Sequence, residues 1–155
     1  MRVFLEWLQA TGIATTVRDS LLLTGGLSAA HLLGFTLVTG GALVANLRLL
    51  GVLLREHAVV TVTRPAARGL AVGLLISAVT GLLLFAPRAP EASVNSTFRL
   101  KMLLLASAAS FQFTVHRAMC ARAAASPAAL RAVGATGFIL WTGVALAGCA
   151  YILVE

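Results

Sequence analysis

The stretch that decides the fold is SLLLTGGLSAAHLLGFTLVTGGALVANL, which runs from Ser20 to Leu47. It contains 28 residues and none of them is charged. A hydrocarbon core roughly 30 Å thick is crossed by about 20 helical residues, so this stretch predicts a membrane span. His31 lies well inside it. Ionisable groups at that depth are costly, and they mark candidate functional sites.

The chain as a whole is strongly apolar. Hydrophobic residues make up 59% of it and charged residues 11%, and its mean hydropathy of +0.96 is far above that of an ordinary soluble domain. Three further uncharged runs follow the first, namely Gly69–Pro87, Met102–His116 and Ala132–Val154. We therefore predict an all-α fold, a membrane four-helix bundle forming a single transmembrane domain over residues 1–155, with spans at about 20–47, 69–87, 100–118 and 132–154.

The charges predict the orientation of these spans. The connections after the first and third spans carry seven arginines and one acid, Glu56, whereas the other side carries five basic and four acidic residues. By the positive-inside rule the two basic connections are cytoplasmic and both termini are periplasmic, in a bacterial inner membrane. The basic residues are spread over loops instead of forming one basic and aromatic face, which argues against nucleic acid as a partner. The bilayer is the expected partner, and oligomerisation stays open.

Before the first span, residues 3–18 show a helical pattern of apolar side chains, with Phe4, Trp7 and Leu8 on one face. We predict an N-terminal interfacial amphipathic helix that bends near Thr11–Gly12. A frayed extension of the first span is the alternative. Glu6 interrupts the apolar stretch too early for the core of a signal peptide, so the N-terminus is expected to be retained.

The second span carries small residues at every fourth position. They are Gly69, Gly73, Ser77 and Gly81. Small residues let neighbouring backbones approach closely in lipid, where apolar surface alone does not drive helices together. This stripe predicts a helix-packing face.

A histidine also closes the third span. His116 lies one helical turn after Gln112, close enough for a hydrogen bond. In an up-and-down bundle the first and third spans run parallel, and counting residues from their expected outer ends places His31 and His116 within about 6 Å in depth. The small neighbours Ser28 and Gly34 leave space beside His31 for a partner helix or for the edge of a planar cofactor. Bis-histidine ligation of haem b between the helices is therefore allowed.

Other interpretations of His31 and His116 remain open. Both could be structural groups bonded to backbone or serine. A metal or proton path is another option, because Met119 and Cys120 follow His116 at the membrane edge, and such soft ligands favour Cu(I). His57 is expected to be solvated in a loop. With no catalytic partner for it and no acid in the spans, no catalytic residues are predicted.

Several segments together resemble a known family. They are Phe4-Leu-Glu-Trp7-Leu, His31-Leu-Leu-Gly34, Asn46-Leu-Arg48-Leu-Leu-Gly51, Thr80-Gly-Leu-Leu-Leu-Phe85, Phe98-Arg-Leu-Lys101, Val115-His116-Arg117 and Leu140-Trp141-Thr-Gly143. Over nearly the whole chain this pattern resembles a family of small uncharacterised bacterial four-helix membrane proteins. It is more distantly similar to the membrane domain of copper-resistance D proteins and to four-helix haem-b cytochromes.

The resemblance implies a four-helix fold and a pair of recurrent histidines, which fall on His31 and His116. It also implies an acid where this chain has Asn46 and a basic residue where it has Cys149. Sequence and resemblance together favour a membrane protein that binds haem b and transfers electrons, with a periplasmic redox or copper protein as a candidate partner. A cofactor-free membrane subunit of a larger complex and a copper-handling protein are the alternatives.

Overall fold

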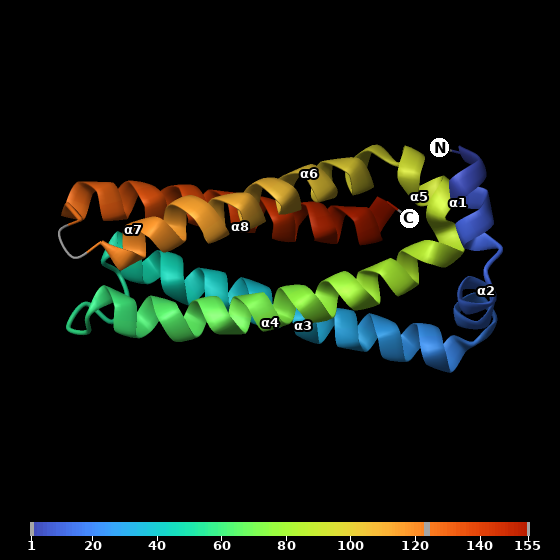
Figure 1. Cartoon of the computed structure of the whole chain (residues 1–155), viewed down its shortest axis with the longest axis horizontal. Coiled ribbons are helices and arrows are strands. Elements are labelled where there is room, and N and C mark those ends of the chain that lie inside the picture. Colours follow the sequence, from blue (N-terminus) through green and yellow to red (C-terminus); the bar gives the residue numbers. More distant parts are fainter. Residues whose placement is uncertain (1, 123–124, 155) are drawn as a thin grey trace.

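A computed structural model describes residues 2–122 and 125–154, and every regular element among them is helical (Figure 1). In chain order these are α1 (Arg2–Gln9), α2 (Gly12–Asp19), α3 (Leu21–Leu50), α4 (Val59–Phe85), the 3-10 turn η1 (Ala86–Arg88), α5 (Ala89–Val94), α6 (Ser96–Phe111), the π-turn η2 (Gln112–His116), α7 (Arg117–Ala121) and α8 (Pro127–Val154).

Three helical stretches of the described chain are long and apolar enough to cross a membrane. They are Leu21–Leu50, Val59–Val94 and Pro127–Tyr151, with mean hydropathies of 1.7, 2.3 and 1.6. The predicted third span corresponds to α6, η2 and α7, which follow one another without a break in segments of 16, 5 and 5 residues. The structure thus confirms the all-α prediction for the described residues and contains three helices of membrane length. It does not confirm the predicted four-helix bundle, and the fourth span belongs to the proposal below.

The second long helix extends beyond the predicted span. α4 begins at Val59, ten residues before Gly69, and carries Arg64 and Arg68 as exposed side chains in its first turns. An uncharged run marks only the apolar part of a helix, so the charged start of α4 lies outside the predicted span.

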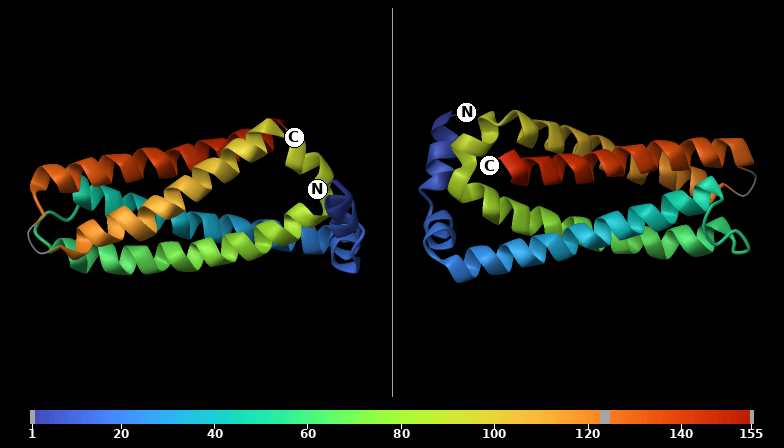
Figure 2. Two further views of the ribbon diagram at one scale, coloured as in Figure 1. Left: turned by 45° about the horizontal axis from the view of Figure 1, so that its top comes forward. Right: turned by 180° about the vertical axis from the view of Figure 1, so that it is seen from behind.

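Two short helices lie across one end of the bundle, beside α5, where the sequence predicted a single bent one (Figures 1 and 2). They part at Thr11, whose hydroxyl caps α2 by accepting from the backbone N–H of Ala14 at 3.4 Å. Gln9 Nε2 donates to the carbonyl of Pro87 at 2.9 Å and ties α1 to η1. The predicted break near Thr11–Gly12 is confirmed, and the alternative of a frayed extension of α3 is wrong.

Helices α3 and α4 pack most closely where glycines face each other. A Cβ placed on Gly73 would lie 2.5 Å from the carbonyl oxygen of Gly34 and 2.8 Å from the backbone nitrogen of Val38. Ser77 and Gly81 also contact α3. Three of the four residues in the predicted small-residue stripe therefore serve helix packing, as expected.

The two helix pairs, α3–α4 and α6–α8, come together at one end and spread apart toward the other (Figure 1; Figure 2, right). We call the end with the connections after α3 and α7 the basic end, because the seven arginines of those connections lie there, and the opposite end, with α1, α2 and α5, the terminal end. A buried apolar cluster from α3, α4, α6 and α8 joins the pairs: Val38, Ala42, Leu70, Ala108, Trp141 and Val144.

Candidate functional site: a buried polar network and a separate histidine

His116 ends the π-turn η2 and is almost fully buried, with 2% of its surface exposed. Its Nδ1 lies 3.2 Å from Gln112 Nε2 and 3.5 Å from Cys120 Sγ. The Gln112–His116 hydrogen bond predicted from their spacing is therefore present. A single π-turn inside an α-helix is rare and occurs often at functional sites.

Trp141 of α8 decides which way the Gln112 amide faces. The indole Nε1–H lies 3.4 Å from Gln112 Oε1 and can only donate, so the amide turns its oxygen to Trp141 and its NH₂ to His116. His116 Nδ1 then accepts, and the ring proton sits on Nε2. Within the described part of the chain, this buried Nε2–H has no hydrogen-bond partner.

Asn46 of α3 is a second buried polar group at the same end. None of its surface is exposed, and neither Oδ1 nor Nδ2 has a partner among the described residues. Its amide lies against Gly137 of α8, where any Cβ would collide with Asn46 Oδ1. It also lines a pocket of about 160 Å³ between α3 and α8, together with Thr39, Ala42, Leu43, Phe138, Trp141, Thr142 and Ala145. We call Asn46, Gln112, His116, Trp141 and Cys120 the inner network.

The hydrogen bonds of His31 are opposite in direction to those of His116. Its Nδ1 lies 3.0 Å from Thr80 Oγ1, and the single hydrogen of that hydroxyl points to the carbonyl of Ile76 at 2.7 Å. Thr80 Oγ1 therefore accepts from His31 Nδ1–H, which leaves the lone pair of Nε2 available. The ring is only half-buried, and Lys101 of α6 lies near enough to interact with it electrostatically.

The structure does not bring His31 and His116 together. His31 contacts Thr80, whereas Cys120, one turn beyond His116, lies beside Thr63 near the start of α4. Thr63 and Thr80 are 17 residues apart, or about 25 Å along the helix, so the two imidazoles are separated by about 20 Å.

The contacts of α8 give the same separation. Asn46, which touches Gly137, follows His31 by 15 residues of α3, or about 22 Å. Trp141, one turn after Gly137, bonds to Gln112, which is one turn from His116. Two axial ligands of one iron must lie within a few ångströms of each other. The proposed bis-histidine pair on one haem is therefore corrected: His31 and His116 belong to different halves of the bundle.

The other predicted cofactor neighbours have different roles. Gly34 is a contact point for α4, because a Cβ there would lie 2.7 Å from Ser77 Oγ. Ser28 is exposed on the outside of α3. The resemblance implies an acid at position 46 and a base at position 149, but the structure keeps these two positions apart. Asn46 lies beside Gly137, which is twelve residues, or about 18 Å, from Cys149 along α8.

Of the predicted copper ligands, His116 and Cys120 are in contact and Met119 is half-buried beside them. No group of three or more His, Cys, Asp or Glu side chains forms a metal cage within the part of the chain that the structure describes. Copper handling stays a prediction.

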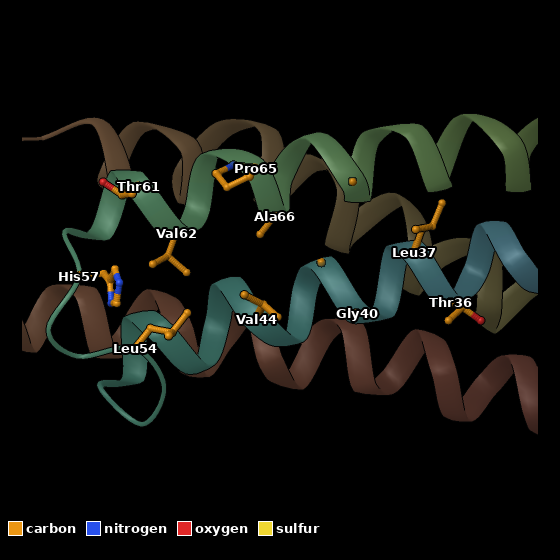
Figure 3. A pocket seen from close by; sticks show the side chains of 12 residues that line it. Thr36, Leu37, Gly40, Val44, Leu54, His57, Thr61, Val62, Pro65 and Ala66 are labelled. Atoms are coloured by element: carbon orange, nitrogen blue, oxygen red, sulfur yellow. The ribbon is translucent and has the colours of Figure 1, made fainter.

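His57 lies in the loop after α3, as expected, with 52% of its side chain exposed and Nδ1 3.3 Å from Glu56 Oε1. Together with Leu54 it closes one end of an apolar groove of about 530 Å³ between α3 and α4 (Figure 3). Gly40, Val44 and Ala66 form much of the groove wall, so the groove is lined mainly by apolar groups.

Together these observations define a class: an all-helical protein with membrane-length helices and a buried polar network at one end. The chain belongs to a family of unknown function (DUF6644), whose model matches residues 4–153. No curated protein and no solved structure matches it. The family match agrees with the predicted kinship to uncharacterised proteins, and no match links the chain to copper-resistance D proteins or to cytochromes.

Proposed function

We propose that this chain is an integral membrane protein that crosses the bilayer four times. The fourth crossing is the α6–η2–α7 line, whose 16, 5 and 5 residues rise about 39 Å, more than the roughly 30 Å of a hydrocarbon core. One leucine or isoleucine from each long helix supports this, since Leu32, Leu75, Leu103 and Ile139 are 61%, 66%, 68% and 69% exposed. Such uniform apolar exposure fits contact with lipid. The positive-inside rule would then place the basic end in the cytoplasm.

Within this membrane domain, we propose that the inner network binds a small ligand through hydrogen bonds. The observation that carries this proposal is Asn46, which is fully buried with both amide atoms unpartnered and lines a pocket. A buried polar group without a partner costs about 1–3 kcal/mol, so a ligand or ordered solvent that bonds to it is strongly favoured. The protein would then act as a ligand-binding protein within the membrane.

The test compares the wild-type chain with Asn46→Leu, which keeps the branched shape of the side chain and removes its polar atoms. In micelles of synthetic detergent alone, we expect the variant to unfold at a higher temperature, because no buried amide is left unpaired. Adding the neutral-lipid fraction of a membrane extract should raise the unfolding temperature of the wild type only, since a ligand stabilises the state that binds it. Equal shifts in both proteins, or none in either, would refute the proposal.

Haem binding is a second candidate, now at His31 alone. The observation in its favour is the Thr80 hydrogen bond, because a histidine that ligates a metal through Nε2 usually donates its Nδ1–H to a neighbour. The orientation of His116, with its proton on Nε2, does not fit a metal ligand.

The absorption spectrum of the protein purified from haem-supplied cells tests this candidate. Binding through His31 alone predicts a high-spin Soret band that His31→Ala removes and that His116→Ala leaves in place. A low-spin spectrum lost in both variants would restore the bis-histidine pair and refute the separation described above. Absence of a Soret band would remove haem from consideration.

A further inference from the structure

We propose that the pocket beside Asn46 binds the ring of a membrane-dissolved quinone. This inference rests on the proposed function, because it names the class of ligand that the inner network would take. It is carried by the size of the pocket, its walls, its polar atoms and the side from which it opens.

The size of the pocket fits a single ring. Its volume is about 160 Å³, and an apolar cavity of about 150 Å³ is enough to hold benzene. Two of its walls are aromatic, Trp141 and Phe138, and flat rings pack well against such walls. A larger fused cofactor does not fit in this volume.

The polar atoms fit carbonyl and hydroxyl groups on such a ring. Asn46 Nδ2 can donate to a quinone carbonyl, and Asn46 Oδ1 can accept from the hydroxyl of the reduced form. Thr39 gives its hydrogen to the carbonyl of Phe35 at 3.0 Å, so its oxygen remains an acceptor. An amide can thus hold both forms, once the buried Asn46 side chain turns from Gly137 toward the pocket.

The pocket also selects against charge. No charged side chain is among its lining residues. A carboxylate or phosphate would bring an uncompensated charge into an apolar site, which is much costlier than a neutral carbonyl. The ligand class is therefore neutral and soluble in lipid.

The entrance faces the bilayer. Leu43 and Phe138 line the pocket and are 46% and 38% exposed on the α3–α8 side of the bundle. A ring can enter between them while its apolar tail stays among the lipid chains. Trp141, only 3% exposed, forms the inner wall.

Tryptophan fluorescence tests this proposal, because the chain has only two tryptophans. Trp7→Phe leaves Trp141 as the single reporter, at the proposed contact with the ring. Titration of the full chain in detergent micelles with a short-tailed benzoquinone should give quenching that saturates, whereas a short-tailed naphthoquinone, with its two fused rings, should not saturate. Asn46→Leu in this background should weaken binding about tenfold, the equivalent of 1.4 kcal/mol.

Two further variants keep the test decisive. Ala145→Leu fills the pocket without altering Asn46 and should abolish saturation, even if Asn46→Leu does not fold. Thr36→Val, on α3 and outside this pocket, should bind as the parent does. Quenching that never saturates, or that is equal in all variants, overturns the quinone assignment. If quinone binding fails but the neutral-lipid extract still stabilises the wild type, the proposed ligand-binding function stands without the quinone assignment. If the extract has no effect, the proposed function and the quinone assignment both fail.

Discussion

His31 and His116 are the same residue type in the same apolar bundle, yet their neighbours give them opposite chemistry. Thr80 accepts from Nδ1–H of His31 and leaves a free lone pair on Nε2, whereas Gln112 donates to Nδ1 of His116 and leaves a free N–H on Nε2. One ring therefore presents a lone pair that can accept a hydrogen bond, and the other presents an N–H that can donate one. The hydrogen-bond partner, and not the burial of the ring, decides which.

The two regions also differ in how firmly they are held. Around His116 the helices α3, α6 and α8 are joined by buried side chains, and all the polar members but Cys120 are nearly inaccessible. Around His31 the two helix pairs spread apart (Figure 1), and the ring is half-buried. Changes in the inner network should therefore cost more free energy than matched changes near His31.

Two glycines allow the strongest test of this difference. Gly137→Leu would drive a side chain into the fully buried Asn46 amide, and we expect a loss of about 3 kcal/mol in the free energy of unfolding. Gly81→Leu meets only the edge of the half-buried His31 ring, 3.0 Å away at Cε1, and should cost about 1 kcal/mol. Reversible unfolding in mixed micelles measures both, with Gly26→Leu, which meets nothing within 4 Å, as the control. A larger loss for Gly81→Leu would contradict the ranking.

Removing the central hydrogen-bond partner in each region gives a smaller contrast. Gln112→Leu leaves both the Trp141 N–H and His116 Nδ1 without this partner in a buried place, and we expect a loss of about 2 kcal/mol. Thr80→Val takes one partner from a ring that is not enclosed, and hydrogen bonds between membrane helices average about 0.6 kcal/mol, so a loss of that order is expected. The same unfolding measurement applies. Equal losses would mean that the inner network is no more tightly enclosed than the His31 region.

Much of this architecture could be predicted from the sequence, because it depends on local patterns. The uncharged runs gave the long helices, the spacing of Gly73, Ser77 and Gly81 gave the packing face of α4, and the four-residue spacing of Gln112 and His116 gave their hydrogen bond. Each of these follows from helical geometry within one segment.

The arrangement of segments relative to one another was not predictable in this way. The expected depth of His116 assumed a helix starting near Met102, but α6 begins at Ser96, which alone adds about 9 Å, and stagger between α3 and α6 adds the remainder. In the sequence Trp141 stands out only as part of a motif, since nothing in its own segment shows that it meets Gln112. Asn46 stands out as a departure from the family pattern, although an amide in an uncharged run is itself a signal of a buried polar site.

The smallest difference between the two histidines is which ring nitrogen carries the proton. It can be measured without any change in the stability of the protein. In protein labelled with ¹⁵N-histidine, we expect protonated Nε2 and unprotonated Nδ1 for His116, and the reverse for His31, at a pH where both rings are neutral. His57, half-exposed in its loop beside Glu56, serves as the internal reference for a ring outside the helices. Gln112→Leu should release the preference of His116 and leave that of His31, whereas Thr80→Val should do the opposite. If His116 keeps its proton on Nδ1 in the unaltered chain, Trp141 does not orient Gln112, and the reason for excluding a metal at His116 is lost.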